Sequence, residues 1–168
     1  MLVKGNTPRG YLNLLLSILL LATVPFMFWK ALCVLTGSSY PIIVVISQSM
    51  APAFNRGDLL FLWNRHPWIR AGEIPVCWFP GRPLPMVHRA IKSVRLDQIT
   101  QLVLTKGDNN EVDDVSLYPP GQLLVGREEI VGLVKGYLPY VGWLSIGLQE
   151  NPVFTGIVAS GLVFLATY

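Results

Sequence analysis

The sequence predicts a mainly β domain that follows an N-terminal transmembrane helix and precedes a short C-terminal apolar helix. Three patterns support this: a long uncharged apolar run near the start, several short runs rich in β-branched residues, and Pro, Gly, Asn and Asp between those runs. Charged residues make up only 14% of the 168 residues, whereas soluble domains usually carry about 25%. The chain therefore contains one modest domain plus a membrane element.

The apolar run near the N-terminus is long enough to span a bilayer. Residues 10–29 carry no charge, and the apolar character continues past Lys30 to residue 35. About 20 helical residues cover the roughly 30 Å hydrocarbon core. The run is longer than the apolar region of a cleaved signal peptide, and no small-residue cleavage site follows it. We therefore expect an uncleaved signal anchor over residues 11–36.

The charged residues beside this run predict its orientation. Lys4 and Arg9 precede it, whereas the next basic residue beyond it is Arg56. Positively charged flanks usually stay on the cytoplasmic side of a membrane. Residues 1–10 are therefore expected to be a cytosolic tail, and residues 37–150 to form a domain across the membrane, as in a single-pass type II protein.

Charge and cysteine content exclude several function classes. The net charge of +3 is scattered and forms no basic run, so nucleic-acid binding has no support. Cys33 lies in the apolar helix and Cys77 in a strand-like run, which argues against a disulfide. No cluster has the spacing of metal ligands, and we expect neither a metal nor a cofactor.

The region after the anchor contains short strands separated by turns. Strands are expected at residues 42–46, 59–63, 74–79, 87–94, 101–104 and 130–134. Segments rich in Pro, Gly, Asn and Asp separate these strands, and helical periodicity is almost absent. A mainly β domain follows from this pattern.

The end of the chain forms a second apolar segment, residues 151–168. From Pro152 to Tyr168 it has 17 uncharged residues, which is at the lower limit for a membrane span. We expect a helix that lies in the interface or packs on the domain and does not span the bilayer.

A candidate nucleophile follows the first expected strand. Ser49 is preceded by Ser47 and followed by Met50 and a turn-rich segment. A serine needs a nearby base to become a nucleophile, and the chain has only two histidines. His66 belongs to an Asn-Arg-His-Pro-Trp turn and is expected to be a surface loop residue. His88 interrupts the start of an apolar strand and is the better candidate.

Acidic residues that could orient an imidazole lie further along the chain. Asp108 belongs to a Lys-Gly-Asp-Asn-Asn segment, and Asp113 and Asp114 follow it. Such clusters usually form turns, but a carboxylate bonded to the imidazole would complete a Ser-His-Asp triad. Spacing alone does not select among the three aspartates.

Three segments together resemble the type I signal peptidase family. Residues 47–62 (SQSMAPAFNRGDLLFL) are similar to its nucleophile box, residues 85–89 (PMVHR) to its base box, and residues 104–118 to its acidic box. Histidine in place of the bacterial lysine is typical of the endoplasmic-reticulum form. The resemblance implies a signal-peptidase-like β catalytic domain in the lumen, acting as a serine endopeptidase that removes N-terminal signal peptides.

The resemblance also implies roles for individual residues. Ser49 matches the family's nucleophile, His88 its general base and Asp114 the aspartate of the catalytic set. Asp108 matches a second essential aspartate with a less settled role. The Ser47 hydroxyl and the Ser49 backbone N–H would form the oxyanion hole.

Two positions depart from the family pattern. Gln48 stands where glycine is common, and Ala51 stands where glutamate is common. Glycine permits unusual backbone angles, so Gln48 implies either an ordinary conformation or local strain. Neither change removes a group that does chemistry.

The implied partners are signal peptides of pre-proteins, other small membrane subunits in a hetero-oligomer, and the lipid bilayer. Pro52, Phe54 and Trp68 are expected to form apolar surface that touches lipid.

Two other interpretations compete with this one. Lys92 lies four residues beyond His88 and would point the same way on a strand, so it or Lys106 could replace His88 as the base. A non-catalytic membrane subunit or scaffold that retains the fold is the alternative from another class.

Overall fold

The computed structural model describes residues 7–97, 100–153, 155–157 and 160. Two compact units divide the chain: Cys33–Leu144 forms one, and Met1–Leu32 with Ser145–Tyr168 forms the other. Residues 1–6 of the expected cytosolic tail, and residues 154, 158–159 and 161–168 of the expected C-terminal helix, lie outside the described residues.

The N-terminal helix α1 covers Pro8–Thr36. The Thr7 hydroxyl accepts a hydrogen bond from the Gly10 N–H at 3.3 Å, which caps the first turn, and proline is favoured at the first helical position. At the other end, Gly37 has φ of 70° and its N–H donates to the Cys33 carbonyl at 2.9 Å. Glycine adopts this left-handed conformation without steric cost and so ends the helix.

This helix matches the long apolar helix expected from the sequence and begins three residues earlier than residue 11. Its 29 residues are more than enough to cross a bilayer, and it is the one helix of that kind in the described part of the chain.

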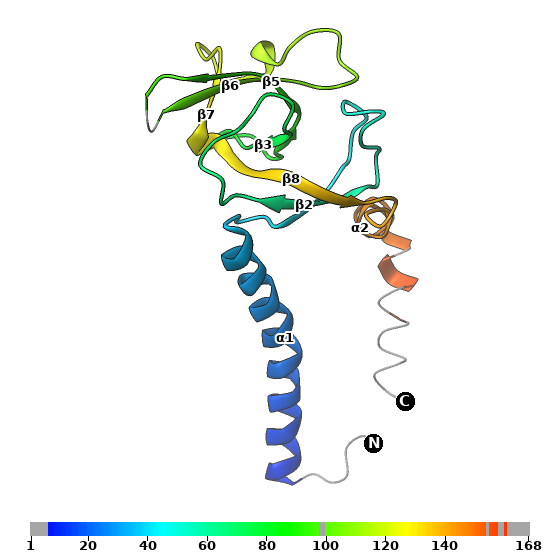
Figure 1. Cartoon of the computed structure of the whole chain (residues 1–168). Coiled ribbons are helices and arrows are strands. Elements are labelled where there is room, and N and C mark those ends of the chain that lie inside the picture. The colour runs from blue at the N-terminus through cyan, green and yellow to red at the C-terminus, as the bar shows by residue number, and fades with distance from the viewer. Residues whose placement is uncertain (1–6, 98–99, 154, 158–159, 161–168) are drawn as a thin grey trace. The chain divides into compact units, whose positions relative to one another are not determined.

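Residues 33–144 form two antiparallel sheets (Figure 1). The larger sheet has the order β1-β2-β8-β3-β4, with β1 (Ile42–Val44), β2 (Leu59–Trp63), β8 (Ile130–Leu138), β3 (Pro75–Cys77) and β4 (Met86–Val87). The smaller sheet has the order β5-β6-β7, with β5 (Arg89–Arg95), β6 (Gln101–Lys106) and β7 (Val125–Gly126). Two 3-10 turns, η1 (Val115–Leu117) and η2 (Arg127–Glu129), and helix α2 (Trp143–Glu150) complete the described elements.

The mainly β prediction is confirmed, and its differences from the structure have local reasons. The expected strand 87–94 is two strands, because the chain leaves the larger sheet at His88 and enters the smaller one. The sequence did not predict β7, which has only two residues, or α2, which has only eight. Elements this short carry too few residues for a clear periodic pattern.

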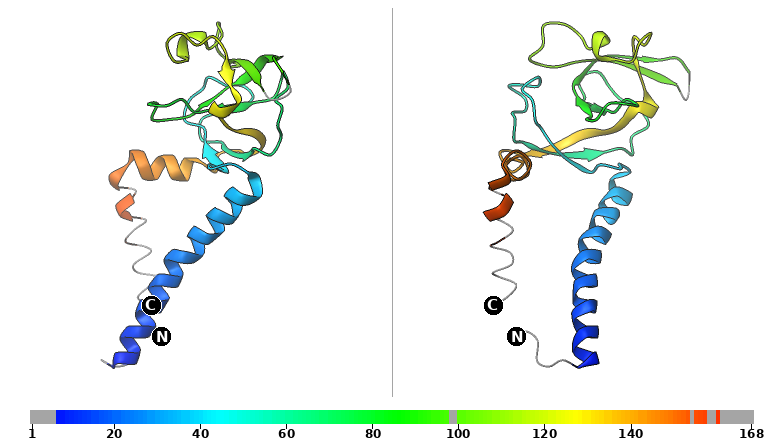
Figure 2. Two further views of the ribbon diagram at one scale, coloured as in Figure 1. Left: turned by 90° about the vertical axis from the view of Figure 1, so that its left-hand side faces the viewer. Right: turned by 180° about the vertical axis from the view of Figure 1, so that it is seen from behind.

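The core of the β domain consists of two apolar clusters. The larger contains Ile69, Cys77, Phe79, Ala90, Val103, Tyr118, Val125, Ile130 and Leu133. The smaller contains Val45, Met50, Phe54 and Leu60. The two further views in Figure 2 show the segment after β1, in cyan, rising beside the β strands. Met50 is buried in the smaller cluster, so the residue immediately after Ser49 is held in the core.

We expect replacement of Leu60 by alanine to destabilise this smaller cluster. Leu60 is 0% exposed, so Leu60→Ala should lower the free energy of unfolding by about 2–5 kcal/mol. Leu84 is 58% exposed, and Leu84→Ala should change it by less than about 0.5 kcal/mol. Pulse proteolysis of the full chain in detergent across a denaturant series measures both, and equal effects would contradict the packing described.

Candidate active site

Three side chains from distant parts of the chain form one hydrogen-bonded series. The Ser49 Oγ lies 2.9 Å from His88 Nε2, and His88 Nδ1 lies 2.6 Å from Asp114 Oδ2. His88 is 4% exposed and Asp114 is 0% exposed. Because the Asp114 carboxylate accepts a hydrogen bond from His88 Nδ1–H, the other ring nitrogen, Nε2, carries no proton and can accept a hydrogen bond from the Ser49 hydroxyl. This arrangement can deprotonate Ser49.

Each member of the series occupies a junction between elements. Ser49 lies in a turn after β1, where the Ala51 N–H donates to the Gln48 carbonyl at 3.1 Å. His88 lies between β4 and β5, at the crossover between the two sheets. Asp114 precedes η1, and its N–H donates to the Thr105 carbonyl at 3.1 Å.

A buried polar network holds one oxygen of the Asp114 carboxylate, Oδ2, while Oδ1 is buried without a hydrogen-bond partner among the described residues. The Thr105 hydroxyl donates to Asp114 Oδ2 at 2.7 Å, and the Tyr118 hydroxyl lies 2.9 Å from the same Thr105 oxygen. Burial raises the pKa of Tyr118, so the phenol keeps its proton and can donate to Thr105. Sequence reasoning gave neither residue a role. The available signal was the alternation of buried residues along β6, which turns Thr105 inward.

The other two aspartates have different surroundings. Asp108 accepts two hydrogen bonds from Arg89, from Nε to Oδ1 at 2.8 Å and from Nη2 to Oδ2 at 2.6 Å. The hydrogen bond from Arg89 holds the pKa of Asp108 below its usual value. Asp113 is exposed, and its Oδ1 accepts the Val115 N–H at 3.3 Å. Among the three aspartates, Asp114 is therefore the one that contacts His88.

The loop after β6 also holds the backbone of the serine segment. The Asn109 N–H donates to the Ser49 carbonyl at 2.8 Å, and Asn109 Nδ2 donates to the Gln48 carbonyl at 3.2 Å. A Cβ atom at Gly107 would lie 2.7 Å from the Ser49 carbonyl oxygen, so this close approach requires glycine. Sequence reasoning also missed this contact.

The geometry around Gln48 is ordinary. Among the non-glycine residues that the structure describes, Tyr140 alone has a positive φ. Gln48 therefore adopts a backbone conformation that any residue can adopt, and the absence of glycine there causes no strain of this kind.

The two expected oxyanion-hole donors lie beside the Ser49 hydroxyl. The Ser47 Oγ is 3.2 Å from the Ser49 Oγ. Within the described part of the chain, no acceptor takes the Ser49 backbone N–H. The Ser49 N–H is thus available to an oxygen that develops negative charge next to Ser49, whereas the Ser47 hydroxyl must turn away from the Ser49 Oγ to donate to that oxygen.

The alternative bases lie in other surroundings. A bulge in β5 between Ala90 and Lys92 changes the alternation, so that Lys92 is exposed whereas His88 is buried. Lys106 Nζ donates to the Gly107 carbonyl at 3.4 Å.

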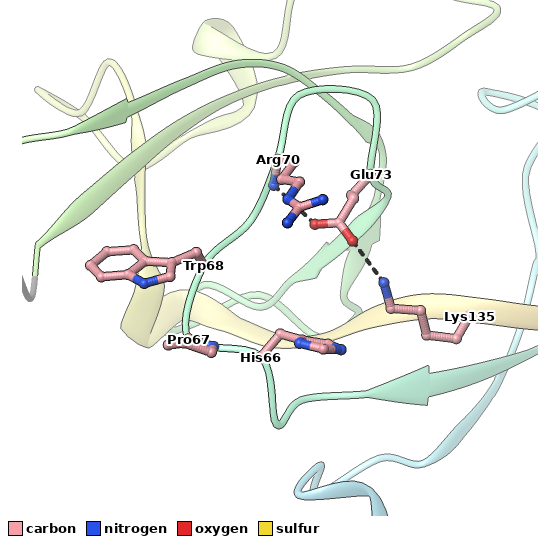
Figure 3. A pocket seen from close by; sticks show the side chains of 6 residues that line it. All are labelled: His66, Pro67, Trp68, Arg70, Glu73 and Lys135. Atoms are coloured by element: carbon pink, nitrogen blue, oxygen red, sulfur yellow. Dashed lines mark hydrogen bonds and ion pairs between the residues drawn. The ribbon is translucent and has the colours of Figure 1, made fainter.

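His66 belongs to a separate pocket of about 320 Å³. Figure 3 shows its lining residues, His66, Pro67, Trp68, Arg70, Glu73 and Lys135. Lys135 and Glu73 form an ion pair across it at 2.7 Å. Burial acts to raise the pKa of Glu73, but hydrogen bonds from Lys135 and from the Arg70 N–H together outweigh it and lower this pKa below its usual value. The lining includes none of Ser49, His88 and Asp114.

The expectation that Pro52, Phe54 and Trp68 form a lipid-facing surface is wrong for Phe54. Phe54 is 6% exposed and packs in the smaller core cluster, and its ring lies edge-on to that of Tyr137 with 5.3 Å between the centroids. Trp68 is half-buried and lies under the Arg95 guanidinium, 3.8 Å from the ring centroid. Pro52 is exposed.

Known proteins resemble this chain over most of its length. The signal peptidase complex catalytic subunit SEC11C of Homo sapiens is 50% identical over 154 residues, which cover 91% of this chain and 80% of that protein. SEC11 of Komagataella phaffii is 43% identical over 164 residues, 95% of each chain. SEC11 of Ajellomyces capsulatus is 45% identical over 157 residues, 86% of this chain and 84% of that protein.

The chain belongs to the SEC11 family of signal peptidase complex catalytic subunits. These relatives confirm, at the level of the family, the resemblance seen in the three sequence segments. No family model matches the chain. In this SEC11-family chain, no group of three or more His, Cys, Asp or Glu side chains among the described residues could hold a metal ion.

A methyl group at position 107 should disturb the serine of this SEC11-family chain. In Gly107→Ala the added Cβ would push the Ser49 carbonyl, and displacement of a nucleophile by about 1 Å typically costs on the order of a hundredfold in rate. Gly136→Ala is the control, because its Cβ would meet Phe61 at an ordinary 3.8 Å. Steady-state cleavage of a pre-protein measures both, and equal rates for Gly107→Ala and wild type would contradict the close approach.

The Arg89–Asp108 ion pair should make the free energy of unfolding depend on pH in the acid range. Because the folded-state pKa of Asp108 lies below 3.8, the pair stabilises the fold fully above that value, and this contribution is lost as pH falls through the folded-state pKa. Denaturation at a series of pH values should show Asp108→Asn less stable than wild type near pH 7, with the difference vanishing in acid. Arg89→Gln should behave alike, and a difference that persists at low pH would refute the assignment.

Proposed function

We propose that this chain is the protease subunit of a signal peptidase complex. It is a membrane-anchored serine endopeptidase that removes N-terminal signal peptides from secretory and membrane pre-proteins in the endoplasmic reticulum. The observation that carries the proposal is the series Ser49–His88–Asp114, hydrogen-bonded at 2.9 and 2.6 Å, in a family whose members are named catalytic subunits. A scaffold would have no need to bury a carboxylate against an imidazole that faces a serine.

Acylation begins at Ser49. Its Oγ forms a bond to the carbonyl carbon of the last signal-peptide residue while the hydroxyl proton passes to His88 Nε2. Asp114 stabilises the imidazolium that results. His88 then gives the proton to the departing amine nitrogen, the C–N bond breaks, and the signal peptide remains as an ester on Ser49.

Deacylation uses the same groups in reverse. A water molecule gives a proton to His88 and adds to the ester carbon, and the C–Oγ bond breaks as Ser49 recovers a proton from His88. In both steps the carbonyl oxygen becomes an oxyanion that accepts hydrogen bonds from the Ser47 hydroxyl and the Ser49 N–H. Loss of one such donor typically costs about 3 kcal/mol of transition-state stabilisation.

The edge of the larger sheet offers a place for the substrate. β4 is the last strand in the order β1-β2-β8-β3-β4, and it ends directly before His88. An extended peptide can add to such an edge by main-chain hydrogen bonds. Pairing there brings a signal peptide alongside the base.

The membrane anchor sets the location of this chemistry. In the proposed topology residues 1–10 are cytosolic, residues 11–36 form a single-pass type II signal anchor, residues 37–150 are lumenal, and residues 151–168 do not span. Asp108 supports the site through Arg89, its neighbour on β5. Other small membrane subunits complete a hetero-oligomer, and tethering at the bilayer raises the effective concentration of emerging signal peptides.

Cleavage of a radiolabelled pre-protein by the reconstituted complex tests the proposal. Ser49→Ala and His88→Ala should each lower kcat by about 10⁴-fold or more, because the triad acts as a unit. Lys92→Ala should retain the wild-type rate. Activity retained by His88→Ala would remove the histidine assignment in favour of a lysine base.

The same Ser49→Ala variant separates the protease from the non-catalytic alternative in cells. In cells that lack any paralogue, pre-proteins should accumulate uncleaved when Ser49→Ala is the sole copy. Normal processing there would favour a non-catalytic membrane subunit.

A further inference from the structure

Asn109 contacts the backbone on both sides of Ser49. Its N–H donates to the Ser49 carbonyl at 2.8 Å, and its side-chain Nδ2 donates to the Gln48 carbonyl at 3.2 Å, across 61 residues of sequence. These two carbonyls belong to the peptide units that precede and follow the serine. One residue therefore holds both peptide planes that determine where the Ser49 side chain lies.

The bond to Gln48 bears on the oxyanion hole. The Gln48 carbonyl and the Ser49 N–H belong to the same planar peptide unit, in which C=O and N–H point in opposite directions when the bond is trans. The cis bond that the structure records in this segment is Ala51–Pro52, three peptide bonds further on. Holding the carbonyl toward Asn109 therefore directs the Ser49 N–H away from the 106–110 loop.

Two donors hold this carbonyl from different directions. The Ala51 N–H donates to it within the turn at 3.1 Å, and Asn109 Nδ2 supplies the second bond from the neighbouring loop. A single donor leaves a peptide plane free to rock about that bond, whereas two donors restrict it. Hydrogen bonds to a carbonyl also polarise the amide and strengthen donation by its N–H.

We propose that Asn109 is a positioning residue for catalysis: its side chain orients the Gln48–Ser49 peptide so that the Ser49 N–H is held ready for the oxyanion. The inference rests on the proposed function, since it needs Ser49 to be the nucleophile. Asn109 acts through this peptide: its hydrogen bonds go to the Gln48 and Ser49 carbonyls, and within the described part of the chain none joins its side chain to the Ser49 Oγ or to His88.

Asn109→Leu tests the inference, because leucine is close to asparagine in shape, lacks the Nδ2 donor and keeps the backbone N–H. With the reconstituted complex, kcat for pre-protein cleavage should fall about tenfold while KM stays unchanged. Glu111→Leu, an exposed change in the same loop, should leave kcat unchanged. Asn109→Gln, which restores an amide donor, should recover part of the loss.

A second readout separates positioning from a merely structural role. A peptide aldehyde reacts with the Ser49 Oγ and forms a tetrahedral hemiacetal whose oxygen occupies the oxyanion hole. An uncleavable peptide of the same sequence binds without forming this tetrahedral adduct. Asn109→Leu should weaken the aldehyde about tenfold and leave peptide binding and the thermal unfolding midpoint unchanged. Unchanged kcat, equal weakening of both ligands, or a lowered midpoint would overturn the inference.

The outcome for Ser49 keeps this inference distinct from the function itself. If Ser49→Ala abolishes cleavage and Asn109→Leu has no effect on kcat, only the role of Asn109 fails. If Ser49→Ala cleaves normally, the proposed function fails first.

Discussion

The arrangement of the site depends on keeping one carboxylate in the protein interior. Asp114 has no exposed surface, and a buried carboxylate is stable only when hydrogen-bond donors replace its water. His88 and Thr105 supply those donors to Oδ2, and Tyr118 holds Thr105 in turn, whereas Oδ1 is buried without a hydrogen-bond partner among the described residues. The imidazole is thereby fixed in one orientation, with Nε2 directed at Ser49. A crossover between two sheets is what brings these residues within reach of one another.

The serine meets this fixed imidazole because its segment is held from two sides. Met50 and Phe54 anchor it in the smaller core cluster, while Gly107 and Asn109 contact its backbone from the loop after β6. A turn on the surface of a domain would otherwise move by more than a proton transfer tolerates. Apolar burial supplies the position of the segment, and backbone hydrogen bonds supply its orientation.

Asp108 and Asp114 belong to the same loop but have different hydrogen-bond partners, and so they stabilise different parts of the site. Asp108 is partly exposed and forms a two-bond ion pair with Arg89, the residue directly after His88. The pair joins the start of β5 to the loop that contacts the serine. Asp114 is buried and bonds the imidazole itself. The resemblance implies that both aspartates are required, and the two sets of contacts are compatible with this: Asp114 bonds His88, and Asp108 bonds the residue next to it.

Local patterns in the sequence determined the mainly β class, the long apolar helix, and Ser49 with His88 as the candidate pair. These depend on periodicity, composition and short motifs, which are properties of neighbouring residues. Spacing did not select among the three aspartates, and the family resemblance pointed to Asp114; the tertiary structure brings Asp114 into contact with His88. Only the tertiary structure decided that Thr105, Tyr118 and Asn109 surround the site. The structure also shows that Phe54, which was expected on the surface, lies in the core. Such contacts join residues 9 to 61 positions apart, and the register of strand pairing that sets them is a property of the whole sheet, which no local pattern contains.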